Sequence, residues 1–325
     1  MRKIRFGIMG AAKIAGKFMD AMKYVRNAEA VTVSSKSPER AEAFREKHGL
    51  PSADTYESML SRSDIDAVYI ATTQNFHKEH VIMCLNHGKH VLCEKAMALS
   101  LEDAKEMFSL AEKKGLFLME AMWSRFLPNI REARKWIADG KIGPVQSAQA
   151  SLGFVCRLPL EGRIANPALG GGGMYDIGVY AIEILSYLMG EEIREVKSFM
   201  RPHPVTGVDE RATMLFRYDS ADAMADISVS SGLKQYMIIN GTKGRIEIPD
   251  FHVGNRCILT DFETGKEEAF IAEFPGGNGF VYEIEETAAC ILSGKTTSAV
   301  VPPETTYEAA RVFDAVIRGI PFMNR

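Results

Sequence analysis

Strand-like segments alternate with segments of helical spacing through the first part of the chain. An apolar run at 4–9 predicts a strand, and Ile14, Phe18 and Met22 then recur every four residues, which is typical of a helix. Five further strand-like segments follow, at 30–34, 52–56, 67–71, 90–93 and 116–119. Parallel strands that are covered by helices on both faces are mostly apolar along their length. The alternation therefore predicts a doubly wound parallel sheet over residues 1–121.

The rhythm changes after about residue 122. The remaining chain predicts helices at 124–139, 176–189, 282–292 and 305–317, and strands at 145–155, 196–200, 212–217, 223–229, 235–239, 245–248 and 256–260. Turn pairs such as Asn240-Gly241 join neighbouring strands and are typical of hairpins. We therefore expect residues 122–325 to form a second α/β domain with a large, mainly antiparallel sheet.

Size and composition restrict the function. A chain of 325 residues with 46% hydrophobic residues can bury two cores, and a net charge of −3 gives no reason to expect nucleic acid or a membrane as a partner. No apolar run approaches the roughly 18 residues of a membrane-spanning helix, and we expect the N-terminus to be a strand edge, not a signal peptide. The five cysteines are scattered and lack metal-ligand spacing, so we expect a reduced cytoplasmic protein without a metal site.

A glycine turn follows the first predicted strand. The segment 10–15 reads Gly-Ala-Ala-Lys-Ile-Ala and occupies the place of a G-x-G-x-x-G fingerprint, with alanine at the second and third glycine positions. Small residues at a strand–helix junction can also serve packing alone. Because this turn follows the first strand of an alternating domain, we favour a cofactor site, in which helix N-terminal amides face a dinucleotide pyrophosphate.

The end of the second predicted strand bears on the choice of cofactor. An NAD site usually has an acidic residue there, which accepts a hydrogen bond from the adenosine ribose. This chain instead has Ser35 and Lys36, with Arg40 four residues beyond the lysine. Hydroxyls and cations suit a 2′-phosphate, whereas the alternative interpretation is a solvated helix start. The pattern predicts NADP(H) as the preferred cofactor, with NAD(H) as the second choice.

Three residues have the chemistry of a hydroxyl–carbonyl redox site. Lys95 follows the apolar strand at 90–93, and Asp176 and Tyr180 are four residues apart, on one face of a predicted helix. Free tyrosine has a pKa of roughly 10, and a nearby ammonium lowers it, so a lysine and a tyrosine together can move a substrate proton. By themselves, the tyrosine is also consistent with a core residue and the aspartate with a helix cap.

Longer segments resemble the Gfo/Idh/MocA oxidoreductase family over nearly the whole chain. The family's E-K-P motif is matched by Glu94-Lys95-Ala96, with alanine in place of proline, and the turn after the fourth strand is matched at 71–77. The segments 119–128 and 169–180 resemble the dimeric dihydrodiol dehydrogenase branch, which has tyrosine at the position of Tyr180 where many members have histidine.

The resemblance implies a Rossmann domain, a C-terminal α/β domain with an open sheet, and NAD(P)-dependent hydride transfer at their junction. It implies catalytic roles for Lys95, Tyr180 and Asp176. It assigns cofactor contacts to Gly10, Ala12, Ile14, Ser35, Lys36, Arg40, Thr72, Thr73, Asn75, His77, Glu94, Lys95, Trp123, Arg125 and Arg163. His80, on the same predicted helix as His77, is expected at the surface.

We therefore expect an NADP-dependent oxidoreductase that acts on the carbinol or carbonyl carbon of a sugar, polyol or dihydrodiol. Two alternatives stay open: a non-redox dinucleotide-binding regulator, and an NAD-assisted glycosidase of the same fold. Because the second sheet has few helices to cover it, we expect a homodimer formed through its open face.

Overall fold

The computed structural model describes residues 2–157 and 159–322, and these residues pack into two compact units. The first unit contains the described part of Met1–Ala98, together with Glu102–Trp123 and Phe274–Thr306. The second contains Leu99–Leu101 and the described residues of Ser124–Glu273 and Tyr307–Arg325. The return of Phe274–Thr306 to the first unit is a feature that the sequence pattern did not indicate. The division into domains at residues 121 and 122 stays a prediction.

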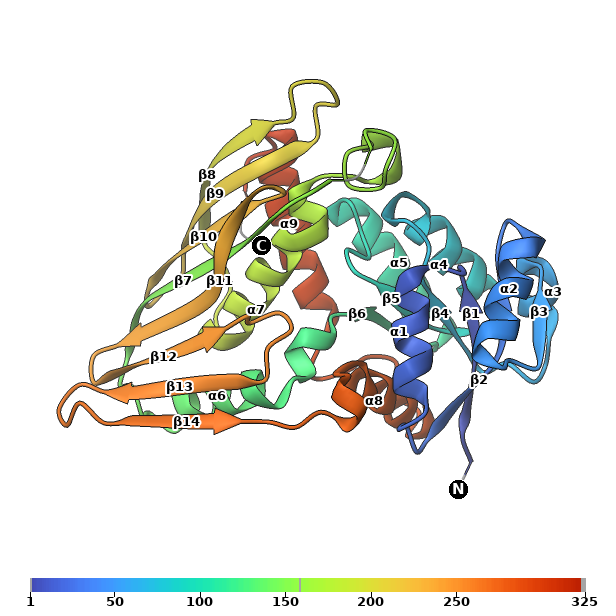
Figure 1. Ribbon diagram of the computed structural model, residues 1–325, viewed down its shortest axis with the longest axis horizontal. Coiled ribbons are helices and arrows are strands. Elements are labelled where there is room, and N and C mark those ends of the chain that lie inside the picture. Colours follow the sequence, from blue (N-terminus) through green and yellow to red (C-terminus); the bar gives the residue numbers. More distant parts are fainter. Residues whose placement is uncertain (1, 158, 323–325) are drawn as a thin grey trace. The chain divides into compact units, whose positions relative to one another are not determined.

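The first unit is built on a six-stranded parallel sheet, as the sequence predicted (Figure 1). The strand order is β3-β2-β1-β4-β5-β6, so the order reverses beside β1. The strands are β1 (Ile4–Met9), β2 (Ala28–Ser34), β3 (Ser52–Asp54), β4 (Ala67–Ile70), β5 (His90–Glu94) and β6 (Leu118–Ala121). In such sheets ligands bind outside the carboxyl ends of the strands at the reversal point.

Helices cover this sheet because its strands are apolar on both faces. They are α1 (Lys13–Met22), α2 (Pro38–His48), α3 (Tyr56–Ser61), α4 (His77–Asn86), α5 (Leu101–Lys114) and α8 (Phe280–Leu292). Phe18 of α1 stacks on Tyr69 of β4 with ring centroids 3.9 Å apart, and both side chains are fully buried. Helix α8 packs beside α1 against β1 and β2, and the Asn27 side chain donates to Glu285 O at 2.9 Å. The late segment thereby completes the first core.

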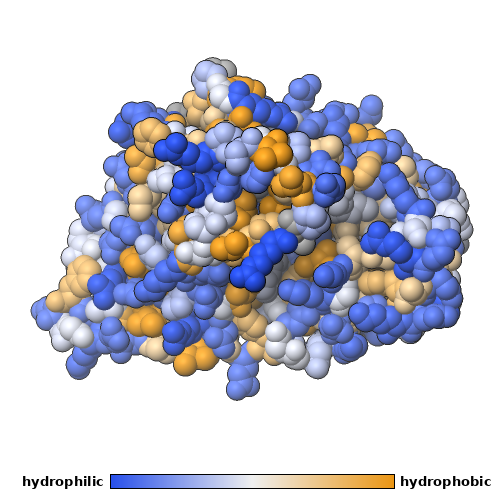
Figure 2. All heavy atoms as spheres, turned by 45° about the horizontal axis from the view of Figure 1, so that its top comes forward, coloured by the Kyte–Doolittle hydropathy of each residue, from blue (hydrophilic) through white to orange (hydrophobic). Residues whose placement is uncertain are grey.

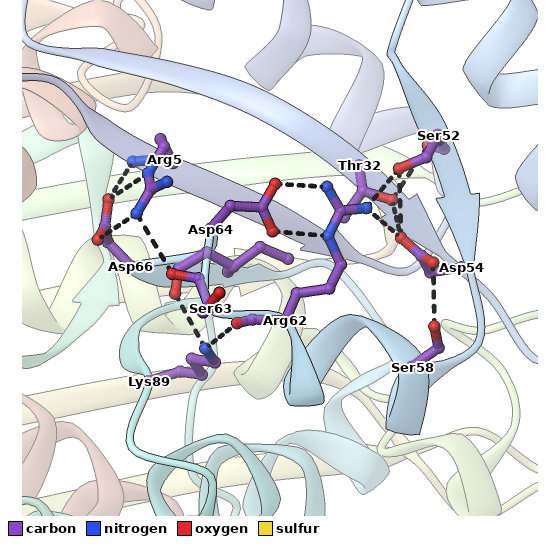
Figure 3. Close-up of polar contacts among 11 residues, drawn as sticks. Arg5, Thr32, Ser52, Asp54, Ser58, Arg62, Ser63, Asp64, Asp66 and Lys89 are labelled. Carbon is purple, nitrogen blue, oxygen red and sulfur yellow. Dashed lines mark hydrogen bonds and ion pairs between the residues drawn. The ribbon is translucent and has the colours of Figure 1, made fainter.

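A network of charged residues closes the first unit near the amino ends of β1 and β4 (Figure 3). Arg62 donates to Asp54 and to Asp64, each at 2.7 Å, and the hydrogen bond from Arg62 lowers the pKa of Asp64 to about 2. Arg5, near the start of β1, donates to Asp66 just before β4 at 3.1 Å. These contacts tie the start of β1, the end of β3 and the segment 62–66 before β4 together.

The second unit contains an eight-stranded sheet of order β14-β13-β12-β11-β7-β10-β9-β8. It is mainly antiparallel, as predicted; among the residues that the structure describes, only the pairing of β10 with β7 is parallel. The strands are β7 (Val145–Val155), β8 (Glu195–Pro202), β9 (Asp209–Arg217), β10 (Asp222–Ser228), β11 (Ser230–Gly241), β12 (Gly244–Pro249), β13 (Arg256–Asp261) and β14 (Glu267–Ile271).

Helices pack on one face of this second sheet. Helix α6 (Pro128–Ala138) lies against β12 and β13, and α7 (Val179–Met189) lies against β7 and β10. A π-helical turn, Met174–Gly178, leads directly into α7, and α9 (Pro303–Arg318) is the last helix. The sequence predicted one α-helix from residue 176, so it missed the π-helical turn.

The surface and the cysteines have the character expected of a protein with a well-buried core. Figure 2 shows one face of the molecule, on which hydrophilic residues predominate and hydrophobic ones are scattered. Among the described residues, no helix has the length and apolar character needed to cross a bilayer. Within the same residues, no group of three or more histidine, cysteine or acidic side chains is arranged to hold a metal ion. All five cysteines are free thiols, and four of them are buried.

Candidate functional site

The glycine turn after β1 is pressed against the end of β4. Gly10 has a φ of +109°, and a Cβ at this position would lie 2.9 Å from Ala71 O. Its amide donates to Ser34 O at the end of β2, at 2.8 Å. Only glycine combines this backbone conformation with so close an approach. The turn therefore lies at the carboxyl ends of three neighbouring strands.

The N-terminus of α1 has the features of a phosphate site. Its N-cap is Ala12, which makes no side-chain capping bond, and no acidic residue stands in the first turn. The first amides of an α-helix have no partner within the helix, and the helix dipole favours an anion there. The pyrophosphate of a dinucleotide fits this requirement, because small residues at 10–12 let it approach the backbone.

The predicted 2′-phosphate residues lie beside this turn. Arg40 donates from Nη2 to Ala11 O at 3.2 Å, and Lys36 Nζ lies 3.8 Å from the centroid of the Phe76 ring. Both cations are exposed, while the Ser35 hydroxyl accepts from the Ser37 amide at 3.3 Å. The structure thus brings the end of β2, the glycine turn and the turn after β4 together around two cations.

The turn after β4 carries the other hydroxyl groups of the predicted cofactor site. The Thr73 hydroxyl donates to Asn75 Oδ1 at 2.7 Å, and Thr72 Oγ1 lies 2.9 Å from His80 Nδ1. His80 was predicted at the surface, and this prediction was wrong. Its side chain is buried, with ring contacts to Tyr56 and Phe76. His80 therefore stabilises the turn after β4 from the interior of the first unit.

His77 connects this turn to the lysine segment. Its Nδ1 lies 2.9 Å from Ala96 O, and its Nε2 lies 3.0 Å from Thr72 O. The ring is buried, and burial lowers the pKa of His77 to about 4, so the imidazole is neutral near pH 7. A single side chain thereby joins the residues that follow β4 to the residues that follow β5.

The lysine segment is held from its other side by Glu120 of β6. One carboxylate oxygen accepts from the Met97 amide at 2.8 Å, and the other accepts from the Thr306 hydroxyl at 2.6 Å. Lys95 itself is half-buried, and Ala96 is fully buried. The backbone around Lys95 is therefore fixed by His77 at Ala96 and by Glu120 at Met97.

Two buried carboxyl groups lie beneath this segment. Glu94 accepts the Tyr69 hydroxyl at 2.5 Å. Glu283 of α8 is fully buried, and neither of its oxygens has a hydrogen-bond partner among the described residues. Burial, together with the nearby Glu94, raises the pKa of Glu283 well above its usual value. Burial thus favours the protonated, neutral form of the Glu283 carboxyl group.

Trp123 and Arg125 have different surroundings. The Trp123 ring lies 5.1 Å from the Phe280 ring within the first unit. Arg125 is buried in the second unit, where its guanidinium is 4.0 Å from Glu183 and its Cζ is 4.6 Å from the centroid of the Tyr187 ring. Burial lowers the pKa of Arg125. Its cofactor contact stays a prediction.

Asp176 and Tyr180 lie at the start of the α7 region in the second unit, and both are buried. Arg163 donates from Nη1 to Asp176 Oδ1 at 2.9 Å. The Tyr180 ring lies 5.5 Å from the His252 ring. No sequence pattern marked His252, because it stands in the turn between β12 and β13 and belongs to no motif.

These features define a class of protein. A parallel sheet with a glycine turn after β1, an uncapped helix N-terminus and a lysine at the end of β5 is the framework of a dinucleotide-dependent oxidoreductase. Residues 4–122 match the family model "Oxidoreductase family, NAD-binding Rossmann fold", and residues 130–247 match "GFO/IDH/MocA C-terminal domain". The chain belongs to the Gfo/Idh/MocA family of NAD(P)-dependent oxidoreductases.

Relatives of similar length support this assignment. The chain is 31% identical over 329 residues to the trans-1,2-dihydrobenzene-1,2-diol dehydrogenase of Mus musculus, covering 98% of this chain and 97% of the relative. It is 30% identical over 331 residues to the enzyme of that name from Xenopus tropicalis, covering 97% and 98%. The resemblance to the dihydrodiol dehydrogenase branch is therefore confirmed.

Solved structures share the same fold over almost the whole chain. The aldose-aldose oxidoreductase from Caulobacter crescentus, complexed with glycerol, has a TM-score of 0.88 and 26% identity, covering 98% of this chain and 97% of that one. KijD10, a 3-ketoreductase from Actinomadura kijaniata in complex with NADP and TDP-benzene, has a TM-score of 0.88, 26% identity and 98% coverage of both chains. Levoglucosan dehydrogenase in complex with NADH, at 20% identity, shares the fold.

Proposed function

We propose that the protein transfers hydride between NADP(H) and the carbinol or carbonyl carbon of a sugar, polyol or dihydrodiol. The observation that carries the proposal is the placement of Lys95 after β5 of a Rossmann sheet, in a chain matching dihydrodiol dehydrogenases over nearly its full length. The named relatives and neighbours act on diols or sugars, and all such substrates contain a carbinol or its carbonyl.

The chain supplies the groups that handle the substrate oxygen, and the nicotinamide, when bound, supplies or accepts the hydride. Lys95 holds that oxygen with its ammonium, and the Tyr180 phenol takes or returns the proton. Asp176, held by Arg163, orients a neighbouring hydroxyl of the substrate. Support for pairing Lys95 with Tyr180 comes from the motif position of each residue and from the proton that the reaction must move.

A substrate panel read by NADPH absorbance tests the proposed reaction. Sugars, polyols and trans-dihydrodiols are oxidised with NADP, and the matching ketones and aldoses are reduced with NADPH. We expect net turnover with at least one compound of this panel. Tight NADP(H) binding without turnover would favour the regulator, and glycoside cleavage without net change in NADPH would favour the glycosidase. Either result would defeat the proposal.

The preference for NADP over NAD rests on Lys36 and Arg40, which flank the glycine turn. Replacing each with alanine removes the cations that would pair with the 2′-phosphate. We expect the double variant to lose at least about tenfold in NADP affinity, roughly 1.4 kcal/mol, with NAD affinity almost unchanged. Lys47→Ala, in the last turn of α2, is the control. Tighter binding of NAD than of NADP by the unchanged protein would contradict this proposal.

A homodimer through the open face of the second sheet is the remaining part of the proposal. Phe199 of β8 is 83% exposed and Leu215 of β9 is 52% exposed, although both lie within strands. Phe199 pairs with Thr213, two residues from Leu215, so their side chains share a face, while Met214 points to the buried face. Large exposed apolar groups on a sheet face are typical of an interface.

Light scattering at micromolar concentration tests this interface. The chain has a mass of 36.0 kDa, and we expect twice this mass in solution. Phe199→Arg should lower the mass to that of one chain. Val205→Arg is the control, because Val205 is also hydrophobic and is 73% exposed but stands in the turn between β8 and β9. A monomeric unchanged protein would defeat the proposal, and a dimer that Phe199→Arg leaves intact would place the interface elsewhere.

A further inference from the structure

Two other parts of the second unit, the loop at 163–166 and Asp209, pack against the glycine run at 170–173. A Cβ at Gly171 would lie 2.6 Å from Ile164 O and 2.7 Å from Asn166 O. The Gly172 amide donates to Ile164 O at 2.9 Å, and the Gly171 amide donates to Asn166 O at 3.0 Å. The loop that carries Arg163 is therefore docked on the glycine run, backbone against backbone.

Asp209 occupies the other side of the run. Gly172 has a φ of +124°, and a Cβ there would overlap with Oδ1 of Asp209 and lie 2.9 Å from its Cγ. Asp209 is the first residue of β9 and is 3% exposed. Its Oδ2 accepts from the Met174 amide at 2.5 Å, and the Gly173 amide also hydrogen-bonds to it. The carboxyl group thus caps the π-helical turn from a distant strand.

The surroundings of Asp209 contain backbone amides and no counter-ion among its described contacts. A buried carboxyl group without a cation is costly, and an apolar residue would fill the same space more favourably. The amides that it binds belong to Gly173 and Met174, three and two residues before Asp176. Helix N-termini favour such an acceptor, which fixes the first turn of the helix.

We propose that Asp209 is a positioning residue for Asp176 and Tyr180. It acts by holding the first amides of the π-helical turn Met174–Gly178, and thereby sets the direction in which that turn presents Asp176. Arg163 holds the Asp176 carboxylate from the docked loop at 2.9 Å, so both restraints meet at the glycine run. This inference rests on the proposed function, in which Asp176 and Tyr180 act on the substrate.

Asp209→Asn and Asp209→Ala test the proposal in the full-length protein. The amide of asparagine keeps one acceptor but turns a donor toward amides that are themselves donors, while alanine removes the acceptor. Asp219→Asn is the matched control, since Asp219 follows the other end of β9 and pairs with Arg194 at the surface. The readouts are kcat, KM, the pH–rate profile, NADPH affinity and hydrogen exchange of peptides covering 171–180.

We expect both Asp209 variants to exchange faster at 171–180 and to lose about tenfold to a hundredfold in kcat. We also expect an altered pH–rate profile, NADPH affinity within about twofold, and no change in Asp219→Asn. Unchanged exchange at 171–180 would overturn the proposal, and this result needs no turnover at all. Faster exchange with normal kcat and an unaltered pH–rate profile would also overturn it, because Asp209 would then be only structural. Absence of turnover in the unchanged protein defeats the proposed function instead, and is seen before any variant is made.

Discussion

Gly172→Ala should destabilise the second unit by more than its small size suggests. The new Cβ overlaps with Asp209 Oδ1 in a region where the carboxyl group has little freedom, since its other oxygen is held by the Met174 amide at 2.5 Å. A φ of +124° costs an L-residue about 1–3 kcal/mol, and overpacking a buried site costs about 1–3 kcal/mol. We therefore expect a loss of about 2–6 kcal/mol, or about 5–20 °C in Tm for a unit of this size.

Gly207→Ala separates the two causes. Gly207 also has a positive φ, of +75°, but nothing lies within 4 Å of the position that its Cβ would take. This variant should lose only about 1–2 kcal/mol, the usual cost of the left-handed backbone region. Thermal and urea unfolding followed by circular dichroism give both values.

The double variant Gly172→Ala/Asp209→Ala completes a thermodynamic cycle. Removing the carboxyl group makes room for the new Cβ, so the two losses should not add, and the coupling should be about 1–3 kcal/mol in the stabilising direction. The reasoning is refuted if Gly172→Ala costs no more than Gly207→Ala. Strict additivity in the double variant would equally show that the two side chains do not compete for space.

Three further predictions concern charge and catalysis. Burial raises the pKa of Asp209 to about 7 from 3.8. Its stabilising contribution is therefore present below pH 3.8 and is lost as the pH rises through 7, by up to about 4 kcal/mol. From pH 4 to 8, the free energy of unfolding should decline more steeply in the unchanged protein than in Asp209→Asn, and parallel curves would contradict this. Glu283→Met should raise the Tm more at pH 8 than at pH 5, because the raised pKa of Glu283 makes the unchanged protein less stable as the pH rises. A gain independent of pH would show that the pKa of Glu283 is the same in the folded and the unfolded protein, and would contradict this prediction. Lys95→Met should lose most turnover, while its cofactor affinity stays within about tenfold of that of the unchanged protein, roughly 1.4 kcal/mol. Tyr180→Phe should change the pH–rate profile. Normal turnover of Tyr180→Phe across pH would remove tyrosine from the mechanism.

The parallel sheet was predictable because its strands are apolar on both faces. The runs at 4–9 and 67–71 need no partner to be recognised as buried strands, and the glycine turn follows the first of them. Strand β14 (Glu267–Ile271) was missed because it is an edge strand with mostly exposed residues, two of them glutamates. Its pattern has no buried face that periodicity could detect.

Candidate catalytic residues could be named from the sequence only where they stand in local motifs, and their roles stay predictions. Lys95 and Asp176 stand in segments that match family patterns, whereas Asp209 precedes a strand predicted only from residue 212. Its partner Gly172 is 37 positions earlier, and nothing near Asp209 in the sequence marks it as buried. His80 was misplaced for a related reason, because its burial depends on Thr72, Tyr56 and Phe76 around it and not on its own helix.

The bridge made by His77 has a consequence for the two turns that it joins. Both ring nitrogens face carbonyl oxygens, Ala96 O and Thr72 O, yet a neutral imidazole carries only one ring proton. At any moment the ring donates to one carbonyl and leaves the other without a hydrogen bond from it. Exchange between the two tautomers transfers the bond from the lysine turn to the cofactor turn without moving a heavy atom. Only the imidazolium, which burial disfavours above about pH 4, would bind both turns at once.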